Sequence, residues 1–259
     1  MKIRNILKNG IILFFVVFLS VFFADSSDAS GRFNMSYIYF GDPADYYKHV
    51  DNALNSLDEI SPNYFNIDGS GNLKLTQALD MNFIKEMHKR GIKVVPFLSN
   101  HWDREKGMKA LSNRHMLSDQ IVSAVVTYDL DGVNVDIENV THLEKDYYTD
   151  FVKLLREKLP EGKTLAVSVA PNPYNLTTGW NGSYDYKNLA KYSDYLMIMA
   201  YDESYPGGPA GPVASYDFVE ATIKEALSEV SKDKIVLGIP FFGRYWKTGG
   251  ASGGAGMSI

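Results

Sequence analysis

Short apolar, β-branched runs alternate along this chain with longer segments of helical periodicity, and this alternation constrains the fold more than any other feature. Seven candidate strands span residues 34–40, 63–67, 93–99, 132–138, 164–170, 194–201 and 234–242. Helical patterns lie between them at residues 45–60, 78–91, 118–129, 144–159, 186–193 and 215–233. Strands separated by helices predict βαβ units and a parallel sheet.

Repeated right-handed crossovers produce either an open doubly wound sheet or a (β/α)8 TIM barrel. No glycine-rich phosphate loop follows the first strand, and polar residues fall at the carboxyl ends of several strands, which favours the barrel. We therefore expect an α/β barrel in one domain at residues 30–259. The glycine-rich residues 247–259 contain no further β run, so about seven strands are expected and the last β/α unit is expected to be missing.

The first residues have the pattern of an export signal. Three basic residues precede an apolar run at residues 11–24, and small residues follow as far as Ala29. We expect a signal peptide at residues 1–29 and a protein that is secreted or associated with the cell envelope or spore. The alternative is an uncleaved membrane anchor, for which the apolar run is short.

Composition excludes some partners and some sources of stability. The net charge of −5 argues against nucleic acid as a partner. The chain has no cysteine, so its stability must come from core packing rather than disulfides. Five scattered histidines have no metal-ligand spacing, and no metal or cofactor is expected.

The stretch DGVNVDIEN at residues 131–139 places polar side chains in an otherwise aliphatic strand. Successive side chains of a strand point to opposite faces, so Asn134, Asp136 and Glu138 share one face. Burial raises the pKa of a carboxyl group, so Glu138 at the carboxyl end of the strand can keep its proton and act as a general acid. The alternative for the two carboxylates is an internal hydrogen-bonded network or a divalent-cation site.

Further polar and aromatic residues follow other strands. Met199 and Tyr201 share one strand face, and Asp202 ends that strand. Asn172 and Trp102 lie just past two other strands, although a solvated loop is the alternative for Trp102. Aromatic rings beside carboxylates suit a sugar, which offers hydroxyl groups to bond and apolar faces for stacking.

Two carboxylates on one strand cannot flank a glycosidic bond from opposite sides. Most glycosidases place one carboxyl group on each side of the bond that breaks. Asp136 and Glu138 instead approach from the same side, which favours substrate assistance. In that mechanism an N-acetyl carbonyl of the sugar is the nucleophile, and the second carboxylate orients it.

These motifs resemble the family 18 glycoside hydrolases, and among them the N-acetylglucosaminidases of spore-forming bacteria that cleave spore cortex and peptidoglycan. DGVNVDIE resembles the family pattern D-G-x-D-x-D-x-E, and MAYD at residues 199–202 resembles its M-x-Y-D motif. The resemblance runs from about Met35 to Trp246. It implies a retaining, substrate-assisted glycosidase that cleaves β-1,4 bonds after N-acetylglucosamine in peptidoglycan or chitin-like glycans.

The resemblance also implies roles for single residues. Glu138 would protonate the leaving-group oxygen and later deprotonate water. Asp136 would orient the acetamido group and stabilise the oxazolinium charge, and Tyr201 would hydrogen-bond the acetamido carbonyl. Asp202 would help to hold the sugar. Asn134 stands where the family pattern has aspartate, which removes one ionisable group from the interior.

The last expected strand is where the chain departs from the family. Family members end with an eighth strand whose tryptophan floors the sugar site, and no such strand is present in the pattern. Trp246, after the seventh strand, is then either a rim contact or a packing residue. The expected partner is an N-acetylated glycan, bound by a monomer that contacts no membrane after signal cleavage. The missing strand motivates an alternative function, a non-catalytic carbohydrate-binding protein of lectin type or an inactive truncated remnant.

Overall fold

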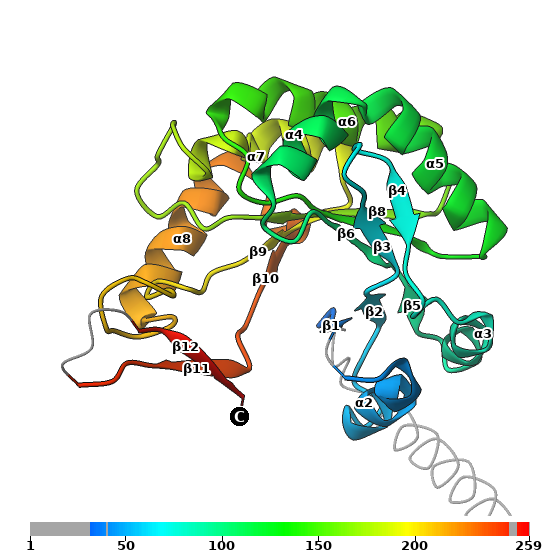
Figure 1. The fold of residues 1–259 in the computed structure, drawn as a ribbon, viewed down its shortest axis with the longest axis horizontal. Helices are drawn as coiled ribbons and strands as arrows, with labels where there is room; N and C mark the ends of the chain where they lie inside the picture. The colour runs from blue at the N-terminus through cyan, green and yellow to red at the C-terminus, as the bar shows by residue number, and fades with distance from the viewer. Residues whose placement is uncertain (1–31, 40, 249–252, 259) are drawn as a thin grey trace, which may run out of the picture. The chain divides into compact units, whose positions relative to one another are not determined.

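The computed structural model describes residues 32–39, 41–248 and 253–258, and Figure 1 shows its ribbon. The chain divides into two compact units, Met1–Asn34 and Met35–Ile259. All helices and strands of the described residues lie in the second unit. The signal peptide predicted at residues 1–29 lies outside the described residues.

Parallel strands in chain order form the centre of the second unit. They are β1 (Met35–Ile38), β2 (Glu59–Pro62), β3 (Phe65–Ile67), β5 (Lys93–Val94), β6 (Phe97–Ser99), β7 (Gly132–Asp136), β8 (Thr164–Val169), β9 (Tyr195–Ile198) and β10 (Ile235–Leu237). One sheet has the order β1-β2-β5, and the other continues from β3 through β6, β7, β8 and β9 to β10. Because β2 leads directly into β3 and β5 into β6, the two sheets are sections of one strand order.

Each of the seven predicted strands overlaps a strand of this order. The break between β5 and β6 contains Pro96, which has no backbone N–H to donate to a ladder. A short strand, β4 (Leu73–Leu75), adds to β3 in antiparallel orientation. In the described part of the chain, β1 and β10 each pair with one neighbour. The fold is therefore α/β and TIM-barrel-like.

Helices connect the parallel strands. They are α2 (Tyr46–Asn52), α3 (Met81–Lys89), α4 (Arg104–Ser112), α5 (Arg114–Thr127), α6 (Lys145–Lys158), α7 (Tyr186–Tyr192) and α8 (Tyr216–Glu229). Helices α4, α5, α6 and α7 cover one face of the sheet (Figure 1). The six predicted helical segments are each represented by one helix, and α4 is an additional one.

The prediction of a helix through residue 60 is wrong, because α2 ends at Asn52 and β2 begins at Glu59. Leu54 and Asn55 have φ angles of 52° and 61°, in the left-handed region that a right-handed helix cannot continue through. Glu59 and Ile60 then pair with both β1 and β5 and are buried. Pairing on both sides outweighs the local helical pattern.

Helix α4 lacks the apolar periodicity that predicts a helix, because it buries only Gly107, Ala110 and Leu111. It begins instead with a side-chain cap. The carboxylate of Asp103 accepts a hydrogen bond from the backbone N–H of Lys106 at 3.1 Å, which satisfies one of the unpaired donors of the first turn.

The prediction that residues 247–259 hold no β run is also wrong. β11 (Phe242–Tyr245) and β12 (Ala255–Ser258) pair in antiparallel orientation, with Gly243 opposite Met257 and Arg244 opposite Gly256. The predicted strand at 234–242 accordingly splits into β10 and the start of β11. Cross-strand pairing therefore forms a strand in a glycine-rich segment whose own β propensity is low.

The aliphatic half of β7 lies in the main core. Val133, Val135 and Ile137 are fully buried in the same cluster as Phe151 and Leu155 of α6. At the start of the strand, a Cβ on Gly132 would lie 1.9 Å from the carbonyl oxygen of Thr164 in β8, so only glycine fits between the two backbones. This packing fixes the face on which the polar half of the strand is presented.

Candidate functional site

Asn134 of β7 faces the interior enclosed by the strands. Its Nδ2 donates to the Tyr37 hydroxyl at 2.8 Å, and Ser168 Oγ donates to its Oδ1 at 3.1 Å. Tyr37 Oη and Ser168 Oγ are 2.6 Å apart, so the Tyr37 hydroxyl donates to Ser168 and the three side chains form a closed ring. Tyr37 belongs to β1, which is not a neighbour of β7 in the sheet order, so the ring spans the interior.

Asp136 and Glu138 are the next residues on the same face. Each keeps a little exposed surface although protein atoms surround most of the side chain. Burial raises the pKa of Asp136. Burial also raises the pKa of Glu138, and the negative charges of Asp136 and Asp202 raise it further. Glu138 therefore holds its proton more firmly, as a general acid requires.

Asp136 has an acceptor that the protein leaves open. Its Oδ1 is buried and has no hydrogen-bond partner among the described residues. A buried carboxylate oxygen without a donor is costly. It is therefore suited to an N–H group supplied by a ligand.

Tyr201 follows β9 and lies within electrostatic reach of both carboxyl groups. Burial raises the pKa of its hydroxyl, and the charges of Asp136, Glu138 and Asp202 raise it further. The hydroxyl therefore stays protonated and can donate a hydrogen bond. Its ring meets Phe242 of β11 edge to face, with centroids 6.0 Å apart.

Asp202 forms an ion pair with Arg244 of β11. Arg244 Nε donates to Oδ1 at 2.8 Å and Nη2 donates to Oδ2 at 2.7 Å. The same guanidinium donates through Nη1 to the Gly254 carbonyl at 3.0 Å. The pair thus joins the residues after β9 to the hairpin formed by β11 and β12, called here the terminal hairpin. Sequence reasoning missed Arg244, because only the hairpin brings it to Asp202.

The remaining predicted substrate-binding residues make contacts within their own segments or with neighbouring ones. Met199 is buried beside Tyr201 in a small cluster of the interior face. Asn172 closes its own loop, since its side chain donates to and accepts from the backbone of Leu176. Trp246 donates its indole N–H to the Gly208 carbonyl at 3.0 Å, which ties β11 to the loop after β9.

Trp102 lies in the loop after β6 and is half exposed, at 50%. Its ring meets Trp180 edge to face at 4.9 Å. Trp180 in turn donates its indole N–H to the Tyr184 hydroxyl at 3.0 Å. Trp102 therefore offers an apolar surface that Trp180 and Tyr184 hold in place, which suits stacking against a sugar ring.

Sequence reasoning also missed Asn100, which precedes this loop and is fully buried. Its side-chain amide contacts the backbone of Glu138. The local signal was present in SNHWD, because a polar residue directly after a buried strand needs hydrogen-bond partners.

The described residues contain neither a cluster of metal ligands nor a membrane-spanning helix. No group of three His, Asp or Glu side chains there is arranged to hold a metal ion. No helix there has the length and apolarity to cross a membrane.

Comparison with known proteins identifies related sequences over most of the chain. The family model described as "Glycosyl hydrolases family 18" matches residues 23–257. "Uncharacterized glycosylase YvbX" of Bacillus subtilis is 26% identical over 169 residues, which cover 61% of this chain and 49% of that protein. The "Cortical fragment-lytic enzyme" of Bacillus anthracis is 27% identical over 128 residues, which cover 49% of this chain and 30% of that protein. The chain thus spans half or less of the length of these curated relatives.

Solved structures extend the similarity to the fold. A chitinase from Chromobacterium violaceum is 26% identical, with a TM-score of 0.72 over 81% of this chain and 69% of that one.

Proposed function

Because the chain belongs to the family 18 glycosyl hydrolases, we propose that it cleaves β-1,4 bonds after N-acetylglucosamine by a retaining, substrate-assisted mechanism. The observation that carries the proposal is the buried Asp136 Oδ1, which has no partner among the described residues and lies on the same strand face as Glu138. Burial and the charges of Asp136 and Asp202 raise the pKa of Glu138. An acetamido N–H would satisfy the Asp136 oxygen.

In the first step, Glu138 transfers its proton to the glycosidic oxygen while the bond from that oxygen to the anomeric carbon breaks. The carbonyl oxygen of the acetamido group bonds to the same carbon from the opposite face, which gives an oxazolinium ion. Asp136 accepts the acetamido N–H and offsets the positive charge. The Tyr201 hydroxyl donates to the carbonyl oxygen and holds it in line.

In the second step, water attacks the anomeric carbon from the face that the leaving group vacated. The Glu138 carboxylate takes the proton from this water, and the bond to the carbonyl oxygen breaks. Two inversions at one carbon retain the configuration, and Glu138 regains its proton for the next cycle.

The substrate we propose is peptidoglycan of the spore cortex, with chitooligosaccharides as the second candidate. The name of the Bacillus anthracis relative, cortical fragment-lytic enzyme, supports the first. The chitinase title of the Chromobacterium violaceum structure supports the second. Both polymers contain the N-acetylated sugar that substrate assistance requires. We accordingly propose action outside the cytoplasm, at the spore or cell envelope.

The test compares wild type with Glu138→Gln on purified cortex and on chitooligosaccharides, with products identified by mass spectrometry. We expect the variant to lose at least about 100-fold in rate, the contribution of a general acid. Glu157→Gln, on the exposed side of α6, is the matched control and keeps wild-type activity. Equal rates for wild type and Glu138→Gln would refute the catalytic assignment.

Two further measurements separate mechanism from binding. A thiazoline analogue of the oxazolinium ion should inhibit the wild type, and an active enzyme that the analogue leaves untouched would contradict substrate assistance. Binding of chitooligosaccharides in calorimetry without turnover would instead support a carbohydrate-binding protein.

A further inference from the structure

Asn100 makes three hydrogen bonds with its side-chain amide, and two of them go to the backbone of Glu138. Its Oδ1 accepts from the Glu138 N–H at 2.8 Å, and its Nδ2 donates to the Glu138 carbonyl at 2.8 Å. Nδ2 also donates to the Asp103 carbonyl at 2.8 Å. Both N–H donors and the carbonyl oxygen of this buried amide are therefore directed at main chain.

These contacts lie where the strand ladder stops. β6 and β7 pair up to Ser99 opposite Asp136, and Glu138 lies two residues beyond that last pair. Without strand pairing, its N–H and carbonyl need another partner. The Asn100 amide takes the place of a neighbouring strand and extends the ladder as far as Glu138.

The residue before Glu138 is held from another direction. The Tyr184 hydroxyl donates to the Ile137 carbonyl at 3.0 Å, and the Ile137 N–H donates to the Tyr148 hydroxyl at 3.3 Å. Side chains from α6 and from the segment before α7 thus fix Ile137, while Asn100 fixes Glu138.

Helix α4 leaves room for the amide. A Cβ on Gly107 would lie 2.9 Å from Asn100 Nδ2 and 2.8 Å from Val140 Cγ1. Such distances are shorter than real Cβ contacts, so glycine at this helical position admits the amide. Glycine is a poor helix former, and at this position it leaves the space that the Asn100 amide occupies.

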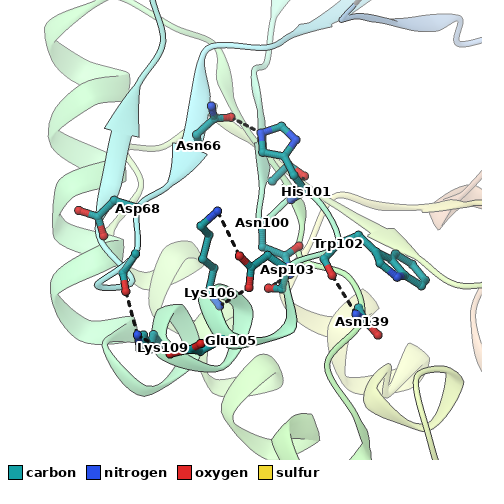
Figure 2. A network of polar contacts seen from close by, with 12 residues as sticks. Asn66, Asp68, Asn100, His101, Trp102, Asp103, Glu105, Lys106, Lys109 and Asn139 are labelled. Atoms are coloured by element: carbon teal, nitrogen blue, oxygen red, sulfur yellow. Dashed lines mark hydrogen bonds and ion pairs between the residues drawn. The ribbon is translucent and has the colours of Figure 1, made fainter.

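A second asparagine joins the same two segments. Asn139 donates from Nδ2 to the Trp102 carbonyl at 2.8 Å (Figure 2). His101, Trp102 and Asn139 all have positive φ angles, of 50°, 63° and 59°. Non-glycine residues adopt this conformation only when their surroundings impose it, and the two asparagine bridges supply that constraint.

We propose that Asn100 is a positioning residue for Glu138, holding its backbone so that the carboxyl group stays beside Asp136 and away from bulk water. The same amide fixes the start of the loop that carries Trp102. One hydrogen-bonded unit therefore holds both Trp102, on which a sugar would stack, and Glu138, the acid that would cleave the bond of that sugar. The kinetic consequence of this role rests on the proposed glycosidase function, whereas its effect on the Glu138 carboxyl group does not.

The test uses Asn100→Ala, with Asn100→Asp as a second variant that keeps side-chain shape and the acceptor for the Glu138 N–H. Asn113→Ala is the matched control, because Asn113 bridges to Asn72 at the other end of α4 without contacting Glu138. Circular dichroism and thermal melts identify the folded variants.

The first readout is the pH titration of the Glu138 carboxyl carbon by ¹³C NMR, assigned by its absence in Glu138→Gln. We expect the Glu138 carboxyl group to titrate at lower pH in Asn100→Ala than in wild type, since loosening the strand end admits water to it. The carboxylate of Asn100→Asp adds a negative charge that opposes this shift, so the titration is judged on Asn100→Ala. Asn113→Ala should titrate as wild type. A Glu138 titration that a folded Asn100→Ala leaves unchanged would overturn the proposal.

The second readout is kinetic. We expect kcat to fall by about 100-fold, the cost of misplacing a catalytic group by roughly 1 Å, with KM changed less than kcat and the basic limb of the pH profile moved to lower pH. A wild type that cleaves no glycan but shows the expected titration shift would refute the proposed function and leave the positioning role standing. If the wild type is active and its Asn100 variants keep its kcat and titration, the positioning role is refuted and the proposed function stands.

Discussion

Glu59 provides the sharpest quantitative test of the interior, because it is a carboxyl group buried far from the proposed site. It begins β2, at the opposite end of the parallel sheet from Glu138, and is 1% exposed. The Tyr195 hydroxyl donates to its Oε1 at 2.5 Å. Burial raises the pKa of Glu59 from 4.5 to about 7, although the Tyr195 hydrogen bond and the charge of Lys93 lower it.

The perturbation is Glu59→Gln, which keeps shape and an acceptor oxygen but cannot ionise. Between pH 4.5 and 7 the folded wild type binds a proton at Glu59 that the unfolded chain has released. The wild type therefore loses stability as pH rises through this window. One pH unit in a pKa is worth about 1.4 kcal/mol, so the loss is about 3 kcal/mol.

The assay is urea unfolding of both proteins at intervals from pH 4 to pH 8. We expect the free energy of unfolding of Glu59→Gln, measured relative to wild type, to rise by about 3 kcal/mol across this range. Glu161→Gln, exposed between α6 and β8, controls for the loss of one carboxylate and should show no such rise. A difference between Glu59→Gln and wild type that stays constant to within about 1 kcal/mol would mean that water reaches Glu59, and the reasoning from burial would fail.

Three further predictions concern the site and its supports. Asp136→Asn removes a charge that raises the pKa of Glu138, so any residual activity should lose its basic limb at lower pH, measured as a pH profile of kcat/KM. Arg244→Met removes both donors to Asp202 and should weaken docking of the terminal hairpin by about 1–3 kcal/mol, read as faster amide hydrogen exchange in β11 and β12; unchanged exchange would contradict it. Gly132→Ala forces a Cβ against the neighbouring strand and should lower the free energy of unfolding in urea by at least about 3 kcal/mol. Gly162→Ala, where the Cβ would meet no atom within 4 Å, should lower it by less despite the φ of 80° at that position.

Most of the parallel strands and the face of β7 were predictable because they depend on local patterns, whereas β2 was missed because its pairing with β1 and β5 outweighs its own helical pattern. Period-two alternation separates Val133 and Val135 from Asn134 and Asp136 whatever the rest of the chain does. Tyr201 and Asp202 were predictable for the same reason, since they directly follow an apolar run.

The hydrogen-bond partners of the site were not predictable, because they come from distant segments. Arg244 reaches Asp202 only through a glycine-rich hairpin whose strands are stabilised by each other. Asn100 acts on Glu138 across a strand boundary, and nothing in SNHWD identifies which backbone its amide contacts. Sequence periodicity predicts which face of an element a residue occupies, but it does not predict which group that residue contacts there.

The closed ring of hydrogen bonds among Asn134, Tyr37 and Ser168 explains why asparagine suits position 134. An amide both donates and accepts, so Asn134 closes the cycle with Tyr37 and Ser168 without carrying charge. An ionised aspartate there could only accept, and the Tyr37 hydroxyl would then lose its donor. It would also place a further negative charge near Asp136 and Glu138, whose pKa values burial already raises. The neutral ring therefore adds no charge to this face of β7, and the charges that raise the pKa of Glu138 are those of Asp136 and Asp202.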